Sequence, residues 1–177
     1  LNERDPIGRS AGCDLSMRLR ALQDRRVPKD YASRITQEVK RLNKLMPNAS
    51  QDPLSLGSMA ALAYPDRIGQ RRKGDAPRYV LSGGKGAVME EGDVLGNAPF
   101  IVVTDTDGNP REARIRQAAQ IDLADIRALY NAQITWVDEC AWSKRERRVI
   151  AYQREKLGAL VLDERLWKDA PDQAIAH

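Results

Sequence analysis

The residue types that perform most enzyme chemistry are sparse in this chain of 177 residues. Histidine occurs once, at His177, which argues against a serine–histidine–aspartate relay and against a histidine-rich metal site. Cys13 and Cys140 lie far apart, a pattern typical of a reducing compartment rather than of a disulfide scaffold. Two cysteines without a neighbouring histidine also argue against a zinc site.

A glycine-rich segment and several acid pairs are the alternative candidate sites. Lys85 lies in Gly83-Gly84-Lys85-Gly86-Ala87, but a phosphate-cradling loop needs a serine or threonine after the lysine, and Ala87 has no hydroxyl group for Mg²⁺. Asp105 and Asp107 precede a glycine in an expected turn, which favours a solvated loop over an acid/base pair. The sequence therefore predicts no catalytic residue and no metal ligand.

Basic clusters are the stronger chemical signal. The chain has 29 Lys+Arg and 25 Asp+Glu, a net charge of +4. Clusters at 67–73 and 144–148 are typical of a phosphate-binding surface, and the alternative is an ordinary solvated face. Arg114 and Arg116 share an expected strand face with Glu112, so an ion pair is the alternative there. The candidate nucleic-acid-binding residues are Arg67, Arg71, Arg72, Lys73, Arg78, Lys85, Arg114, Arg116, Lys144, Arg145, Arg147 and Arg148.

Aromatic residues make up only 5% of the chain, so platforms for base stacking are few. Five of them fall on expected strands, where core packing is favoured over stacking. These are Tyr79, Trp136, Trp142, Tyr152 and Trp167. The basic residues near the start of the chain, Arg18, Arg20, Arg25 and Arg26, are interpreted as solvated helix faces. Sequence-specific base reading is therefore not predicted.

Residues 1–63 are predicted to be helical. Asp14 can cap a first helix, Pro28 ends its pattern, and a second amphipathic helix runs from there to Pro47. Asp52-Pro53 supplies a cap and a first-turn proline for a third helix. Three short amphipathic helices of this kind need a partner surface.

From about residue 76 the pattern changes to short strands. The expected strands lie near 78–82, 85–89, 99–104, 112–121, 134–142, 147–153 and 158–166. Asp122 can cap one helix between them. The predicted fold class is α+β: about three helices, then an OB-like antiparallel β-barrel with one inserted helix. An open sheet with a helix on one face is the alternative.

Several strings resemble the bacterial HrpB branch of the DEAH/RHA ATP-dependent helicases along almost the whole chain. The most specific is Ala63-Tyr64-Pro65-Asp66-Arg67-Ile68. Glu3-Arg4-Asp5-Pro6, Arg78-Tyr79-Val80-Leu81-Ser82 and Leu157-Gly158-Ala159-Leu160-Val161-Leu162 are similar to family strings as well. Gly83 stands where the family pattern has asparagine.

This resemblance implies a division of the chain into three parts. Residues 1–63 would be the end of the helical ratchet region, 64–170 an OB-like domain, and 171–177 the start of a linker to a further C-terminal part. The motor motifs of such helicases match nothing in this sequence. ATP and Mg²⁺ are therefore expected as cofactors of separate motor domains, with no cofactor in this region, and the enzyme activity is expected in the parent protein.

The resemblance also implies partners: single-stranded RNA or DNA, the motor domains, and a protein activator. The start at Leu1 rather than methionine fits a piece of a longer protein. No apolar run approaches the roughly 18 to 20 residues of a membrane span, so we expect a cytoplasmic protein without a membrane partner. Two alternatives stay open, a stand-alone single-strand-binding module and a protein-docking domain.

Overall fold

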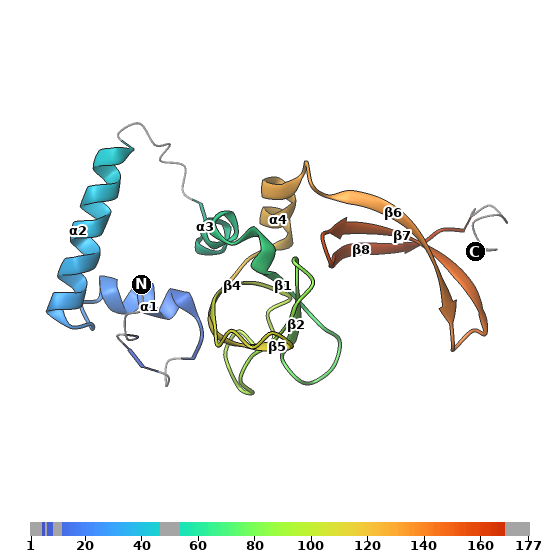
Figure 1. Ribbon diagram of the computed structural model, residues 1–177, viewed down its shortest axis with the longest axis horizontal. Helices are drawn as coiled ribbons and strands as arrows, with labels where there is room; N and C mark the ends of the chain where they lie inside the picture. The colour runs from blue at the N-terminus through green and yellow to red at the C-terminus, as the bar shows by residue number, and fades with distance from the viewer. Residues whose placement is uncertain (1–4, 6, 9–11, 47–53, 169–177) are drawn as a thin grey trace.

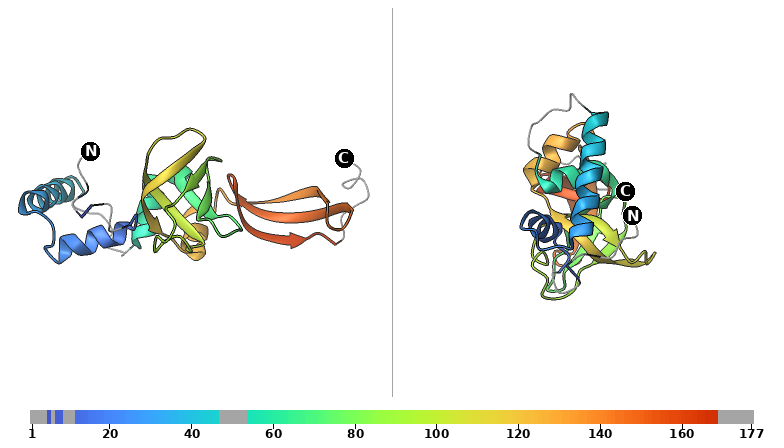
Figure 2. Two further views of the ribbon diagram at one scale, coloured as in Figure 1. Left: turned by 90° about the horizontal axis from the view of Figure 1, so that it is seen from below. Right: turned by 90° about the vertical axis from the view of Figure 1, so that its left-hand side faces the viewer.

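The computed structural model describes residues 5, 7–8, 12–46 and 54–168, and it arranges them as an elongated molecule. Helices α1 and α2 lie at one end, a small β-barrel with two helices beside it lies in the middle, and a three-stranded sheet projects at the other end (Figure 1). The same order is visible from below (Figure 2).

The first two helices confirm the pattern of the sequence. Helix α1 (Leu15–Gln23) begins at the predicted cap, where the Asp14 carboxylate accepts a hydrogen bond from the Ser16 backbone at 2.8 Å. Helix α2 (Lys29–Leu45) follows Pro28 and has no buried residue. Cys13, just before α1, joins the barrel, since its carbonyl accepts a bond of 2.9 Å from the Ala118 backbone.

Arg18 corrects the interpretation of the early arginines as solvated. Its side chain is buried, with 8% exposed. The guanidinium donates to the Asp5 carboxylate and to the carbonyls of Gly12 and Asp14 at 2.8 and 2.9 Å. An arginine paired on every side can be buried, and here it holds the segment that leads into α1.

Helix α3 (Leu56–Ala63) begins one turn later than expected. Its cap is Ser55, whose hydroxyl accepts a bond of 3.0 Å from the Ser58 backbone. The predicted cap at Asp52-Pro53 lies outside the described residues. Gly57 sits against the end of the barrel, where a Cβ atom would come within 2.1 Å of the Gln120 carbonyl oxygen.

Five strands form a closed barrel in the order β1-β2-β3-β5-β4. They follow a single 3₁₀ turn, η2 (Pro65–Arg67). The strands are β1 (Ile68–Arg71), β2 (Arg78–Leu81), β3 (Gly86–Val88), β4 (Phe100–Thr106) and β5 (Glu112–Gln120). Strands β3 and β5 run parallel and the other pairs antiparallel. An odd number of strands cannot alternate direction around a closed ring, so one parallel pair is unavoidable. The α+β class with an OB-like barrel is confirmed.

Strand β4 packs on both of its faces. Ile101 and Val103 lie in the barrel interior with Tyr79, whereas Phe100 and Val102 lie in a second core with the helices. All four of these β4 residues are buried, which explains a continuous apolar run in place of alternation. Burial raises the pKa of Tyr79 to about 12, and its hydroxyl donates to the Leu95 carbonyl at 2.8 Å.

Strand β1 was missing from the predicted set. Residues 68–71 contain one large apolar side chain, so neither periodicity is visible. Gly69 belongs there because the strand crosses the packed interior, where a Cβ atom would come within 3.2 Å of both Ile101 and Leu81. The basic residues from Arg71 onward therefore lie at the end of the first barrel strand. The sequence had predicted them to lie before the first strand.

The last three strands form a sheet of their own, which we call the connector sheet. Helix α4 (Leu123–Tyr130) leads from the barrel to β6 (Thr135–Ser143), β7 (Arg148–Leu157) and β8 (Leu160–Leu166), which pair antiparallel in that order. All three strands were predicted, but their separation from the barrel was not. The interval 64–170 thus contains two sheets, and residues 171–177, the expected linker, lie outside the described part.

The base of the connector sheet is fixed to the barrel. The Gln70 side chain donates to the Val161 carbonyl at 2.6 Å and accepts from the Val161 backbone at 3.0 Å. The Ala159 backbone donates to the Ser82 carbonyl at 3.0 Å. Leu157 and Leu160 join the core between barrel and helices. The other end, the β6–β7 turn, projects away from the barrel (Figure 1).

Candidate nucleic-acid interface

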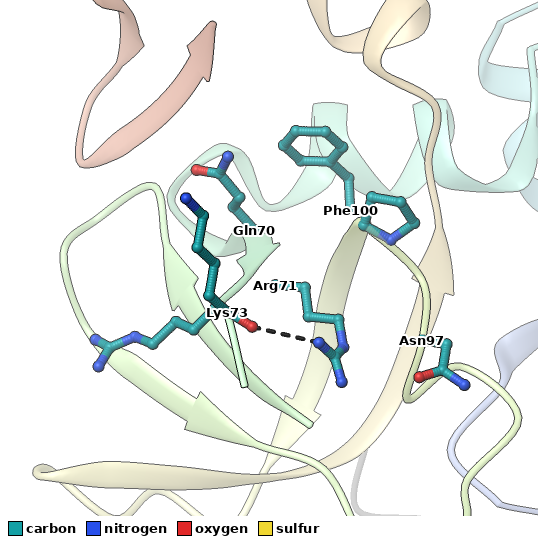
Figure 3. Close-up of a pocket in the computed structure, with 7 residues that line it drawn as sticks. Gln70, Arg71, Lys73, Asn97 and Phe100 are labelled. Carbon is teal, nitrogen blue, oxygen red and sulfur yellow. Dashed lines mark hydrogen bonds between the residues drawn. The ribbon is translucent and has the colours of Figure 1, made fainter. Parts of the chain in front are cut away.

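The loop between β1 and β2, residues 72–77, is held in place by Arg71. The Arg71 guanidinium donates to the carbonyls of Gly96 at 2.7 Å, Gly74 at 3.0 Å and Asp75 at 3.3 Å. Figure 3 marks a further bond of 3.3 Å to the Arg72 carbonyl. Because its donors are used on backbone oxygens, Arg71 positions the loop, and its role differs from that of its neighbours.

Arg72 and Lys73 follow Arg71 and are exposed. Within the described part of the chain, neither side chain has an ion-pair partner. Their charge is therefore available to an anionic ligand. In OB-fold barrels the loop between the first two strands is one of the regions that bind oligonucleotides.

An open depression of about 290 Å³ lies beside this loop. Its lining residues are Gln70, Arg71, Arg72, Lys73, Asn97, Pro99 and Phe100. Lys73 and Gln70 extend side by side over one part of it, while Asn97 and Phe100 come from the opposite rim (Figure 3). The rim is fixed, since Tyr79 and Arg71 both hydrogen bond to carbonyls of the segment 95–98. The exposed Lys73 ammonium and the Asn97 amide can contact a phosphate and its sugar.

Gln70 and Asn97 were not singled out in the sequence. They are uncharged and belong to no motif, and only the folded chain brings them to the same depression. Gln70 also ties the depression to the base of β8 through its two bonds to Val161.

The outer face of β2, β3 and β5 gathers three further candidates. Strand register places Arg78 opposite Val88, and Val88 opposite Arg114, while the alternate residues face the barrel interior. Arg116 is exposed one step further along the Arg114 side of β5. This face directly follows the 72–77 loop, because Arg78 is the first residue of β2.

The expected ion pair of Glu112 forms with another strand. Glu112 pairs with Arg78 at 3.5 Å, and Arg114 and Arg116 have no ion-pair partner among the described residues. Backbone hydrogen bonds from Asn109 and Arg114 lower the pKa of Asp107, with smaller contributions from the charges of Arg116 and Arg114. This carboxylate therefore stays ionised and orders the β4–β5 turn.

Two other barrel candidates are separated from this group. Arg67 stacks over the Tyr64 ring at 5.0 Å and donates to the Thr104 carbonyl at 3.5 Å, so it is partly engaged. Lys85 is exposed in the turn between β2 and β3, at the opposite end of β2 from Arg78.

The remaining candidates lie at the free end of the connector sheet. Lys144, Arg145 and Arg147 occupy the β6–β7 turn, and Arg148 pairs with Glu146 at 2.8 Å. This turn lies far from the barrel (Figure 1). Ten of the twelve candidates therefore form two surfaces, one around the 72–77 loop and one at the tip of the hairpin, and Arg67 and Lys85 belong to neither.

The described residues contain no cluster of three or more histidine, cysteine, aspartate or glutamate side chains suited to a metal ion. None of their helices is both long and apolar enough to cross a membrane.

Three comparisons with known proteins agree on one family. The model of the connector region of ATP-dependent RNA helicase HrpB matches residues 133–166, which include the whole connector sheet. The ATP-dependent RNA helicase HrpB of Escherichia coli K12 is 26% identical over 135 residues, which cover 75% of this chain. The matched chain spans only 16% of that relative.

Two solved structures share the fold. The crystal structure of the E. coli DExH-box NTPase HrpB matches 94% of this chain with a TM-score of 0.69 and 21% identity. The crystal structure of the E. coli DEAH/RHA helicase HrpB matches 92% with a TM-score of 0.59 and 20% identity. The matches cover 20% and 19% of those chains. The matched connector region, the curated relative and the shared fold all indicate a fragment of an HrpB-type helicase.

Proposed function

We propose that this chain is a non-catalytic accessory region of an ATP-dependent RNA helicase, and that its barrel binds and guides a single strand of RNA. A motor in the longer protein would hydrolyse ATP with Mg²⁺, and this region would hold the strand. The observation that carries the proposal is the pair Arg72 and Lys73, exposed and without ion-pair partners on a loop that Arg71 fixes beside an open depression.

The chemistry of this surface favours contact with the phosphate backbone. Arg72, Lys73, Arg114 and Arg116 offer charge without a rigid arrangement of donors and acceptors for a base edge. We therefore expect binding that tolerates any sequence and weakens as salt rises. RNA is proposed over DNA because the curated relative is named an RNA helicase.

Fluorescence anisotropy with a labelled single-stranded oligouridine tests the proposal. Arg72→Ala with Lys73→Ala should reduce affinity at low salt about tenfold, and should lower the slope of log K against log salt by about 1.4, since each single-strand phosphate contact contributes about 0.7. A matched control is Lys29→Ala with Lys44→Ala on α2, which removes the same charge from a distant exposed helix.

The control separates local contact from net charge. If both double variants weaken binding equally, the loop is not the site. If the unmodified chain fails to bind at low salt, single-strand guidance is wrong.

Helix α2 favours protein docking as a second candidate function. Its apolar stripe includes Val39, Leu42 and Leu45, which are 50%, 41% and 66% exposed. A partner surface is expected to cover this stripe, and the motor domains or an activator could provide it. Leu42→Glu should leave the stability of this chain unchanged but should abolish association with separately purified motor domains in a pull-down.

A further inference from the structure

All three tryptophans of the chain lie on one face of the connector sheet. Successive residues of β6 point to opposite faces, so Trp136, Cys140 and Trp142 lie on the same side of the sheet. Cys140 pairs with Ala151 of β7, whose carbonyl accepts a bond of 2.9 Å from the Trp167 backbone just after β8. Because paired residues in a sheet point to the same side, Trp167 shares this face.

The tryptophans differ in how far their rings are already used. The Arg165 guanidinium lies over Trp136, 4.4 Å from the ring centroid. Trp142 is 63% exposed, and no described arginine or lysine stacks on it. An indole this exposed at the end of a projecting hairpin contributes little to the core, so it is available to a ligand.

The charge beside Trp142 is positive and unbalanced. Lys144, Arg145 and Arg147 follow it within the turn, and no described residue forms an ion pair with any of the three. The acidic residues of the same face, Asp138, Glu155 and Asp163, lie nearer the barrel.

On the opposite face of the sheet, the charged side chains of Arg154 and Lys156 form ion pairs with acidic neighbours. Arg154 contacts Glu139 at 2.5 Å and Glu164 at 2.6 Å, and Lys156 contacts Glu139 at 2.8 Å. These pairs leave little free charge. A polyanion with exposed aromatic bases therefore matches the tryptophan-bearing tip better than it matches the reverse side.

We propose that the tip of the connector sheet is a second single-strand contact, in which an unpaired base stacks on Trp142 while Lys144, Arg145 and Arg147 hold the flanking phosphates. The proposal rests on the proposed function, because both name a single strand as the ligand, but it assigns a site separate from the barrel loop. Stacking on an indole tolerates every base, so this contact would add affinity without sequence preference.

Intrinsic fluorescence can report on Trp142 alone. Trp136→Phe with Trp167→Phe leaves Trp142 as the one tryptophan, and thermal melting checks that this variant folds. Titration with a twelve-nucleotide oligouridine should quench the remaining emission, whereas an abasic oligomer of equal length should quench it much less. Equal quenching by both oligomers, or no quenching at an RNA concentration that saturates anisotropy, would overturn base stacking.

Substitution in the otherwise unmodified chain gives an independent readout. Trp142→Ala should weaken oligouridine binding about fivefold or more, and Trp142→Phe should retain most of the affinity. Leu166→Ala is the matched control, since Leu166 is 58% exposed on the opposite face and should have no effect.

The two sites fail separately. If Trp142→Ala binds normally while Arg72→Ala with Lys73→Ala binds weakly, the stacking proposal is wrong and the barrel function stands. If the unmodified chain binds no RNA and Trp142→Ala disrupts a pull-down with the motor domains, the tip is a protein contact and both proposals are wrong.

Discussion

The barrel and the connector sheet solve the same problem, how to stabilise short strands, in different ways. The barrel closes on itself, and β4 is covered on both faces by apolar side chains. The connector sheet is covered only at its base, and most residues of β6 are exposed. The barrel therefore has its own core, whereas the connector sheet depends on the barrel for support.

The difference also separates two ways of presenting positive charge. Around the barrel, Arg71 fixes a loop so that Arg72 and Lys73 are displayed beside a depression. In the connector sheet, ion pairs link the three strands, and three cations without an ion-pair partner among the described residues, Lys144, Arg145 and Arg147, lie in the turn. The barrel loop thus presents its charge from a fixed position, whereas the β6–β7 turn presents its charge at a distance from the barrel.

The largest expected difference is in core packing. Ile101→Ala removes a side chain with no exposed surface from the barrel interior and should lower the free energy of unfolding by about 2 to 5 kcal/mol. Ile150→Ala, in the half-buried outer part of β7, should cost about 1 kcal/mol or less. Urea titration measures both, and equal losses would show that the two regions share one core.

The attachment of the connector sheet should be the next most sensitive feature. Gly158 has a φ of +56°, and a Cβ atom there would lie 2.4 Å from the Ser82 carbonyl oxygen. Gly158→Ala should therefore destabilise the chain by about 1 to 3 kcal/mol.

Gly108→Ala is the control for this substitution, because Gly108 has a φ of +79° but open space around it. It measures the backbone strain without the steric clash. If Gly158→Ala costs no more than Gly108→Ala in the same urea titration, the close contact with Ser82 does not hold the sheet.

A smaller effect is expected from acid on the connector sheet. Hydrogen bonds from Lys156, and then from Arg154, hold the pKa of Glu139 below its usual value of 4.5. A pKa that is lower in the folded than in the unfolded chain stabilises the fold above the usual value, and this stabilisation is lost as pH falls through the folded pKa. Glu139→Gln should flatten the decline of stability below pH 4.5, which urea titration at a series of pH values measures.

The reactivity of the two cysteines should also differ between the barrel and the connector sheet, and measuring it requires no substitution. Burial, followed by the charge of Asp93, raises the pKa of Cys13 to about 12, so its thiol should not react with a disulfide reagent at pH 8. Cys140 is exposed on β6 and should react quickly. We expect one thiol to react quickly and the second to react only in denaturant. Rapid reaction of both thiols would mean that Cys13 is not held against the barrel.

The sequence predicted the elements whose signals are local. The cap at Asp14, the apolar run 100–103 and the alternation along 112–120 correspond to α1, β4 and β5. Strand β1 was missed because Gly69 and Gln70 are chosen for contacts with distant residues, not for a periodic pattern. The separate connector sheet was missed for the same reason, since its boundary depends on bonds such as that between Ser82 and Ala159.

The candidate site was predicted by charge but not by role. The clustering of basic residues in the sequence identified Arg71, Arg72 and Lys73 together. Only the fold shows that Arg71 donates its hydrogen bonds to backbone carbonyls, while Arg72 and Lys73 are exposed. Trp142 was expected in a core. The run Asp138-Glu139 interrupts apolar alternation in β6 and was the available sign of an exposed strand.

Photocrosslinking tests the central claim, that a single strand passes along the loop after β1, most directly. Single-stranded RNA containing 4-thiouridine would be irradiated with the chain, and the attached peptides would be mapped by mass spectrometry. We expect crosslinks within residues 70–78, and we expect them to disappear at high salt. Crosslinks confined to the helices before residue 46, or a salt-resistant pattern that avoids the 70–78 segment, would contradict the account.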